Sequence, residues 1–107
     1  MQQLTILQRQ YLRRLSHPLK PIVQVGKNGL TDNVIQAVNE ALEIHELIKV
    51  KFLDFQDEKR ELSDTIVDGS GSALVALIGN VAIFYREQPD AEKRKVTLPA
   101  ARDGRGR

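Results

Sequence analysis

Residues 21–32 constrain the fold more than any other part of this sequence, because they combine a strand, a loop and a helix start. Residues 22–25 form a β-prone run between proline and glycine. Gly26 and Gly29 allow positive φ angles and close approach of a ligand. Thr31 then supplies the hydroxyl group of a helix N-cap. Such a turn presents backbone N–H groups, the positive end of a helix dipole and one lysine together, which predicts a phosphate-binding site.

The pattern Gly26-x-x-Gly29 is weak evidence when it is taken alone. It is shorter than the dinucleotide-binding fingerprint and lacks the Lys-Ser/Thr ending of a P-loop. An ordinary tight turn and a phosphate site explain it equally well. Three further features favour nucleic acid: the loop opens a helix, it contains Lys27, and it follows a helix that carries exposed arginines.

The composition is that of one small domain. The chain has 107 residues, of which 41% are hydrophobic, and this is enough for one core and too little for two. Cysteine is absent, which excludes disulfides and thiolate metal sites and suits a reducing cytosol. No segment approaches the roughly 18 apolar residues of a membrane span. We expect a soluble, unprocessed, cytoplasmic monomer with no membrane partner.

Charge is distributed unevenly along the chain, although the net charge is only +2. Residues 1–30 hold five basic residues and no acidic one, whereas residues 31–85 hold four basic and ten acidic residues. Residues 86–107 hold seven basic and four acidic residues. The basic first third carries the glycine loop. A chain polarised in this way indicates an anionic partner that meets one face.

The first helix is predicted by five apolar residues on one stripe: Leu4, Leu7, Tyr11, Leu12 and Leu15. Arg9 and Arg13 are four residues apart on the opposite side. A solvated helix face and an anion contact explain them equally well. The helix should end before Pro18, because the residue before a proline is disfavoured in the α conformation.

The middle of the chain alternates between helix and strand. Apolar residues at helical spacing over residues 34–42 predict a second helix. Residues 47–55 predict a strand in which Lys49 and Lys51 alternate with apolar side chains. Asp57 is the candidate N-cap of a third helix.

The third helix is expected over residues 57–68, with a stop at 69–71. Residues 73–78 are apolar throughout, which predicts a central strand covered on both faces. Residues 79–80 form a two-residue hairpin, and residues 81–86 form the returning strand. The order α-β-α-β-α-β-β predicts a single α/β domain with three helices and a four-stranded mixed sheet that contains parallel pairs.

Residues 87–107 show no apolar periodicity, and we expect a mobile basic tail after a domain at residues 1–86. No catalytic grouping is evident. His17 and His45 lie at predicted helix ends, where structural roles are favoured, and no metal-ligand spacing occurs. We therefore predict no enzymatic activity, cofactor, metal or small-molecule substrate. A small hydrolase acting on a phosphorylated compound is the weakest alternative.

Three ordered blocks, at residues 12–31, 45–51 and 77–86, resemble the bacterial YhbY-like proteins. These are stand-alone CRM domains, the chloroplast RNA splicing and ribosome maturation type, and the resemblance spans residues 4–86. It implies an RNA-binding α/β domain similar to the C-terminal domain of bacterial translation initiation factor three, with the glycine loop at the RNA surface. It also implies association with precursor ribosomal RNA of the large ribosomal subunit.

The predicted RNA surface combines this loop with basic side chains. The loop residues are Gly26, Lys27, Asn28 and Gly29. The basic strip that should extend it consists of Arg9, Arg13, Arg14 and Lys20, bordered by Lys49 and Lys51. Recognition should depend on shape and phosphates more than on bases, because the few aromatic residues fall mostly at core positions. The alternative is a protein-interaction adaptor on the ribosome that docks through the first helix and the acidic third helix.

Overall fold

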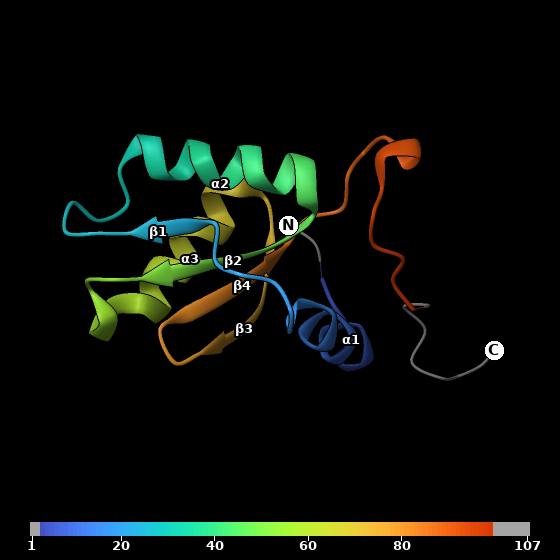
Figure 1. Ribbon diagram of the computed structural model, residues 1–107, viewed down its shortest axis with the longest axis horizontal. Helices are drawn as coiled ribbons and strands as arrows, with labels where there is room; N and C mark the ends of the chain where they lie inside the picture. The colour runs from blue at the N-terminus through green and yellow to red at the C-terminus, as the bar shows by residue number, and fades with distance from the viewer. Residues whose placement is uncertain (1–2, 100–107) are drawn as a thin grey trace.

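A four-stranded sheet with helices on both faces forms the body of the molecule (Figure 1). The computed structural model describes residues 3–99. Within this range the α-helices are α1 (Ile6–Ser16), α2 (Asp32–His45) and α3 (Lys59–Ser70). The strands are β1 (Val23–Val25), β2 (Leu47–Phe52), β3 (Ala73–Ile78) and β4 (Val81–Tyr85). Two short 3-10 turns are η1 (Gln56–Glu58) and η2 (Ala91–Lys93). The predicted element order and mixed α/β fold are confirmed.

The strand order in the sheet is β1-β2-β4-β3, with β1 and β2 parallel and β4 antiparallel to both of its neighbours. The prediction that residues 73–78 form a central strand is wrong, because β3 lies at the edge. The predicted hairpin at residues 79–80 places β4 beside β3, and β4 then pairs with β2. The apolar character of β3 has another source: helix α3 packs on one face and helix α1 on the other.

Two hydrophobic clusters lie on opposite faces of the sheet. Helices α2 and α3 cover the larger cluster, whose fully buried members include Val25, Val38, Leu42, Val50, Phe52, Ile66 and Phe84. Helix α1 and the segment after β4 cover the smaller cluster, formed by Leu12, Leu47, Val75, Ile83, Tyr85 and Val96. Helix α1 leaves the β1 side of its face open, so that Gln24 and Lys51, which are paired across β1 and β2, are exposed (Figure 1).

Helix α1 contacts the sheet along a narrower stripe than the leucine spacing predicted. Leu12 is fully buried, but Leu7 is 56% exposed and Leu15 is 39% exposed. The other buried positions of α1 are Gln8 and Ser16, each four residues from Leu12. Gln8 forms a capping box with Thr5, and Ser16 donates a hydrogen bond to the carbonyl group of Arg13. Local polar bonds therefore allow these two positions to be buried.

Arg9 is only partly exposed, because its guanidinium group bonds to the sheet. Its Nη1 atom donates to the carbonyl groups of Leu74 and Val75 on the edge strand β3. The pairing of β3 with β4 is irregular between Leu74 and Ala76, as in a β-bulge. Arg9 thus satisfies carbonyl groups at this irregularity and blocks an edge on which another strand could pair.

Helix α3 begins at Lys59, two residues later than predicted, because η1 occupies residues 56–58. Asp57 is therefore not its N-cap. Gly69 lies inside the helix, and a methyl group at this position would lie 3.6 Å from Cγ2 of Ile35 in α2. The helix ends at Ser70, and its C-cap is Gly71, whose φ of 67° is left-handed.

The structure differs from the expected mobile tail over residues 87–99, which pack against the domain. Glu46 is fully buried at the C-cap of α2, and its carboxylate accepts hydrogen bonds from three backbone N–H groups. The donors are Gln88 at 2.7 Å, Lys95 at 2.6 Å and Val96 at 2.8 Å. The remainder of the predicted tail, residues 100–107, lies outside the described residues.

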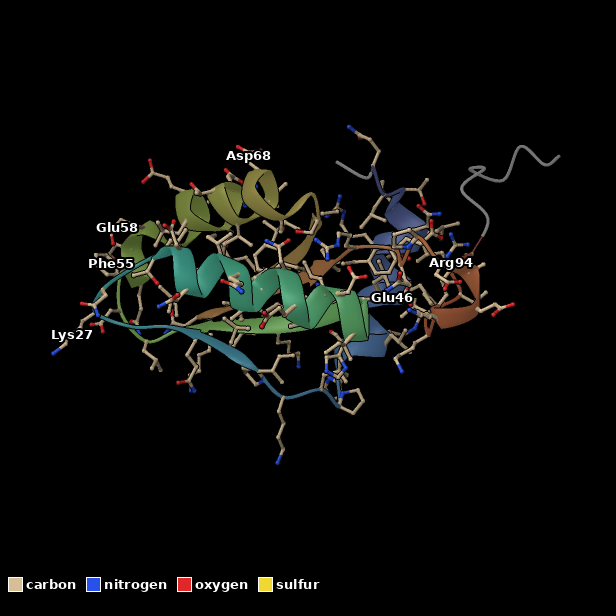
Figure 2. The ribbon with its side chains drawn as sticks, turned by 90° about the horizontal axis from the view of Figure 1, so that it is seen from above. Lys27, Glu46, Phe55, Glu58, Asp68 and Arg94 are labelled. Atoms are coloured by element: carbon tan, nitrogen blue, oxygen red, sulfur yellow. The ribbon has the colours of Figure 1, made fainter. Side chains whose placement is uncertain are left out.

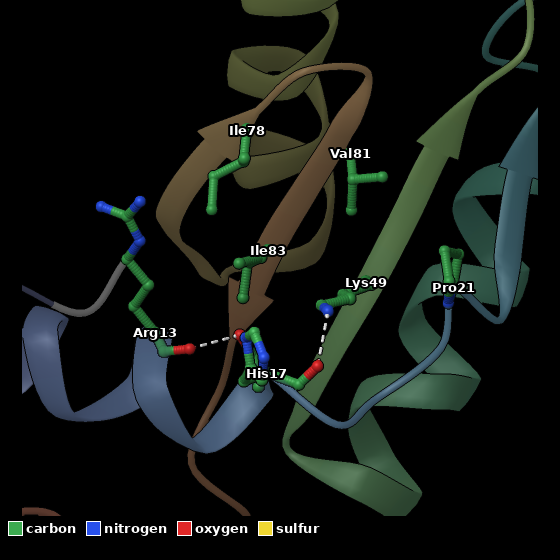
Figure 3. Close-up of a pocket in the computed structure, with 8 residues that line it drawn as sticks. Arg13, His17, Pro21, Lys49, Ile78, Val81 and Ile83 are labelled. Atoms are coloured by element: carbon green, nitrogen blue, oxygen red, sulfur yellow. Dashed lines mark hydrogen bonds between the residues drawn. The ribbon is translucent and has the colours of Figure 1, made fainter.

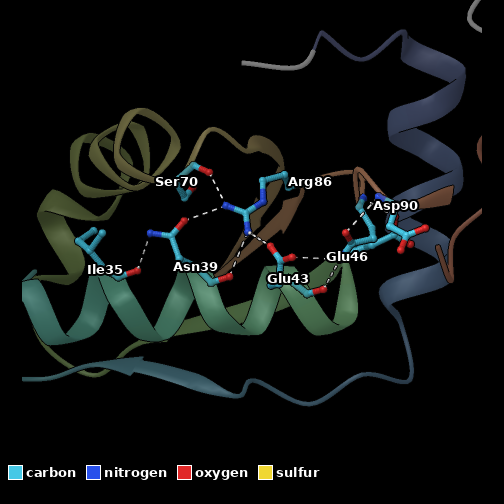
Figure 4. A network of polar contacts seen from close by, with 8 residues as sticks. Ile35, Asn39, Glu43, Glu46, Ser70, Arg86 and Asp90 are labelled. Carbon is cyan, nitrogen blue, oxygen red and sulfur yellow. Dashed lines mark hydrogen bonds and ion pairs between the residues drawn. The ribbon is translucent and has the colours of Figure 1, made fainter. Parts of the chain in front are cut away.

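Arg86 connects helices α2 and α3 beside Glu46 (Figure 4). Its guanidinium group donates to the Asn39 side chain at 2.8 Å and to the Ser70 carbonyl at 2.7 Å. A further bond runs to Glu43 at 3.4 Å. We refer to Glu46, Arg86 and residues 87–96 as the Glu46 end of the molecule.

Candidate nucleic-acid interface

The glycine loop is a closed turn between β1 and α2. The Gly29 amide donates to the Gly26 carbonyl at 3.0 Å, and the Thr31 amide donates to the Gly29 carbonyl at 3.1 Å. Gly29 has a φ of 72°, which a side chain would disfavour. Thr31 is the N-cap of α2, as predicted, and its Oγ1 atom accepts a hydrogen bond from the Val34 amide at 3.2 Å.

These internal bonds determine which loop amides can reach a ligand. The Gly29 amide is occupied inside the turn and is not a free donor. Over residues 3–99, the amide groups of Lys27 and Asn28 have no hydrogen-bond acceptor, and both residues are exposed. The first-turn amides of α2, at Asp32 and Asn33, have no acceptor within the helix. Donors at the loop tip and at the helix N-terminus therefore lie on neighbouring parts of the chain.

The loop lies at the opposite end of the molecule from Glu46 (Figure 2). The chain that leaves β2 runs beside it, because the Val25 carbonyl accepts hydrogen bonds from the Leu53 amide at 2.9 Å and the Asp54 amide at 3.3 Å. Lys51, near the end of β2, is exposed and pairs with Gln24, two residues before Gly26. We refer to residues 26–33, Lys51 and residues 53–55 as the loop end.

Phe55 is a residue of the loop end that was not among the predicted site residues. Its side chain is 42% exposed, and its φ is 59°. The ring lies against Gly29, since a methyl group at Gly29 would be 3.6 Å from Cε2 of Phe55. The apolar residues of β2 that face the larger cluster are at even positions, so an aromatic residue at position 55 departs from the alternation. This departure from the alternation was the sequence feature that could have indicated a functional role for Phe55.

The basic side chains of α1 form a second group, at the other end of the open sheet face. Arg13, His17 and Lys49 line a hollow of about 420 Å³ (Figure 3). Ile78 and Val81 contribute apolar lining. The Lys49 ammonium group donates to the Leu19 carbonyl at 3.0 Å and the His17 carbonyl at 3.5 Å. These bonds connect β2 to the segment between α1 and β1.

The predicted site residues therefore occupy four places rather than one continuous strip. The four loop residues and Lys51 lie at the loop end. Arg13, Arg14 and Lys49 lie at the α1 end, and the exposed Lys20 lies in the link that follows α1. Arg9 lies at the β3 edge. Helix α1 and the loop are at opposite ends of the sheet (Figure 1), so the arginines of α1 do not surround the loop.

No cluster of three or more His, Cys, Asp or Glu side chains that could hold a metal ion is found among residues 3–99. In the same part of the chain, none of the helices has the length and apolar composition of a membrane span.

The fold and the loop together define an α/β domain with exposed backbone donors at a helix N-terminus. The chain belongs to the CRS1 / YhbY (CRM) domain family, whose profile matches residues 4–86. This match confirms the resemblance that the sequence blocks indicated.

Relatives in three bacteria carry names that refer to RNA. The chain is 43% identical to Probable RNA-binding protein YqeI of Bacillus subtilis, with 90% of this chain and 99% of the relative covered. It is 39% identical to a protein of Haemophilus influenzae named RNA-binding protein, with 90% and 95% covered. Protein SAV1595 of Staphylococcus aureus, described as a candidate RNA-binding protein, has a similar solution structure. The TM-score is 0.76 at 40% identity, with 91% of this chain and all of that chain covered.

Proposed function

We propose that this protein is a non-enzymatic RNA-binding protein that grips the phosphate backbone of RNA at the loop end. The names of the relatives support RNA as the partner. We propose further that the RNA is ribosomal RNA of the large-subunit precursor, that the protein assists ribosome assembly, and that it acts in the cytoplasm. These finer statements rest on the resemblance to the YhbY-like proteins.

The observation that carries the proposal is that the loop has features the fold does not require. A methyl group at Gly26 would meet no atom within 4 Å, and Gly26 is not among the glycines with positive φ. Nothing in the fold therefore demands a glycine there, whereas a phosphate that approaches the backbone closely does. The donors are the amides of Lys27 and Asn28, which have no acceptor in the described part of the chain, and those of the N-terminus of α2.

The charged residues of the loop end determine on which side of the loop a phosphate can bind. Lys27 is its only cation within the turn, and Lys51 is the next along the open face of the sheet. Asp32, in the first turn of α2, partly offsets the helix dipole. We therefore place the RNA backbone on the side of Lys27 and Lys51. Phosphate contacts of this kind position RNA without reading its bases.

The experiment is a comparison of two charge reversals. Lys27→Asp changes the charge at the loop end, and Lys93→Asp makes the same change at an exposed position of the Glu46 end. We expect weaker binding of a single-stranded RNA by Lys27→Asp only, measured by fluorescence anisotropy. Equal losses in both variants would mean that the overall charge, rather than the loop, attracts the RNA.

The rival function is that of a protein adaptor that docks through α1 and α3. It is favoured by the exposed side chains of Ile6 and Leu7, which are 75% and 56% accessible on α1. A gel-shift assay with a protein-free fragment of large-subunit ribosomal RNA separates the two functions. A shift supports direct RNA binding, and no shift at micromolar protein supports the adaptor. Crosslinking in cells followed by sequencing of the attached RNA tests the ribosomal assignment.

A further inference from the structure

Phe55 occupies a position where the fold does not favour phenylalanine. Its backbone is left-handed, with φ 59° and ψ 38°, a conformation that glycine and asparagine adopt far more readily than a bulky residue. Its carbonyl group accepts a hydrogen bond from the Glu58 amide at 3.0 Å and so begins η1, a role that any residue could fill. Its side chain is 42% exposed, so core packing does not explain the aromatic ring either.

The Phe55 ring lies beside the glycine loop. It lies against Gly29, with Cε2 and Cζ 3.6 and 3.8 Å from the position of a methyl group on that residue. Figure 2 shows Phe55 and Lys27 at the same end of the molecule. An RNA whose phosphate is held at the tip of the loop would therefore bring a neighbouring base within reach of the ring. Leu53, which is 46% exposed, extends the apolar surface next to it.

The charges around Phe55 favour a base over a phosphate. Asp54, Asp57 and Glu58 are exposed close to Phe55 in the chain. Carboxylates repel a phosphate group, but they accept hydrogen bonds from the amino groups of bases. An exposed ring with acidic neighbours thus fits the uncharged face of a nucleobase, which stacks on aromatic side chains regardless of sequence.

We propose that Phe55 is a stacking platform for one nucleobase of a single-stranded RNA whose backbone is bound at Lys27 and Asn28. This inference rests on the proposed function and adds a base-binding subsite to it. The Phe55 subsite would add nothing to the binding of a free phosphate or of a nucleic-acid backbone without bases, which the loop alone would hold.

The first test compares stability with affinity in Phe55→Asn. Asparagine tolerates the left-handed backbone, so the urea midpoint should stay the same or rise. Affinity for a ten-nucleotide single-stranded RNA should fall about tenfold, as expected for the loss of one stacked base. Ile44→Asn is the matched control, because Ile44 is also exposed but lies near the Glu46 end. A lower midpoint with unchanged affinity would show that the ring only packs the loop, and would overturn the proposal.

The second test uses the absence of tryptophan from the chain. Phe55→Trp introduces a single fluorophore at the subsite, and Ile44→Trp introduces one at the control position. We expect the RNA to quench the emission of Phe55→Trp, and an abasic oligonucleotide with the same backbone to leave it unchanged. Equal changes with both ligands would overturn base stacking.

The two proposals fail in different ways. If wild-type protein binds the RNA and Lys27→Asp weakens binding while Phe55→Asn does not, the stacking platform is wrong and the loop contact stands. If wild-type protein does not bind the RNA at all, the proposed function itself is wrong.

Discussion

Helix α2 joins two ends of the molecule that differ in whether their backbone N–H groups have hydrogen-bond acceptors. In the loop before its N-terminus, the exposed residues Lys27 and Asn28 have amides without an acceptor among residues 3–99, and the first-turn amides lack acceptors within the helix. At its C-terminus, the buried carboxylate of Glu46 accepts three amides from residues 88–96. Among residues 3–99, the donors at the first end have no acceptor, whereas the donors at the second end bond to a carboxylate of the same chain.

This difference assigns RNA binding to one end of helix α2 and folding stability to the other. Donors that have no acceptor in the free protein are available to a ligand, and their loss costs the fold little. Removing the acceptor of donors that bond a buried carboxylate lowers the free energy of unfolding, because a buried polar group without a partner has lost its hydration and gained no hydrogen bond. We therefore expect substitutions at the loop end to change RNA affinity, and substitutions at the Glu46 end to change the free energy of unfolding.

The largest effect is expected for Glu46→Ala. The substitution removes three hydrogen bonds to a carboxylate and leaves their donors unpaired, so the free energy of unfolding should fall by about 3–5 kcal/mol. Urea denaturation monitored by circular dichroism measures this. RNA affinity of the folded fraction should not change.

A matched variant separates the carboxylate from the backbone at this position. Glu46 has a φ of 64°, so Glu46→Gly should be about 1 kcal/mol less destabilising than Glu46→Ala. Equal losses would show that the left-handed backbone is not strained there. A loss below about 1 kcal/mol in both variants would contradict the structural role of the carboxylate.

The next effect is expected for Lys27→Asp, which should weaken RNA binding about tenfold, equivalent to about 1.4 kcal/mol. The thermal midpoint should remain nearly unchanged, because Lys27 is exposed. The slope of log affinity against log salt should become shallower by about 0.7 if one phosphate contact with single-stranded RNA is lost. An unchanged slope would remove Lys27 from the contact surface.

A smaller effect on the fold is expected for Gly29→Ala. The φ of 72° should make alanine cost about 1 kcal/mol of unfolding free energy. The new methyl group would lie at an ordinary contact distance from Phe55, so no further loss from crowding is expected. Chemical denaturation provides the measurement, and a stabilised variant would mean that the turn differs from the one described.

The smallest effect on the fold is expected for Gly26→Ala, within about 0.5 kcal/mol of wild type. The methyl group meets no atom within 4 Å in the free protein. RNA affinity should nevertheless fall, because the methyl group stands where the phosphate approaches. A variant that keeps full affinity would show that the RNA does not come close to Gly26.

The sequence predicted those parts of the molecule that short-range rules determine. The N-cap at Thr31 and the hairpin at residues 79–80 depend on residues close in the chain, and both were found. The edge position of β3 depends on which strand β4 pairs with, which no local pattern reports. The role of Glu46 depends on a bond to Val96, fifty positions away.

The candidate site shows the same limit. The loop could be predicted because its glycines and its N-cap lie together in the sequence. Whether the basic residues form one continuous strip could not be predicted from the sequence, because the answer depends on the orientation of α1 relative to the loop. Arg9 and Lys49 carry charge that the sequence reveals, but the structure engages both with backbone carbonyl groups.

The most direct test of the account is a titration of the isotope-labelled protein with a single-stranded RNA, followed by the chemical shifts of the backbone amides. If RNA binds at the loop end, the largest changes occur at residues 26–33 and 53–55, and the amides of residues 86–96 do not respond. Largest changes at residues 86–96, or along the outer face of α1, would contradict the assignment of RNA binding to the loop end.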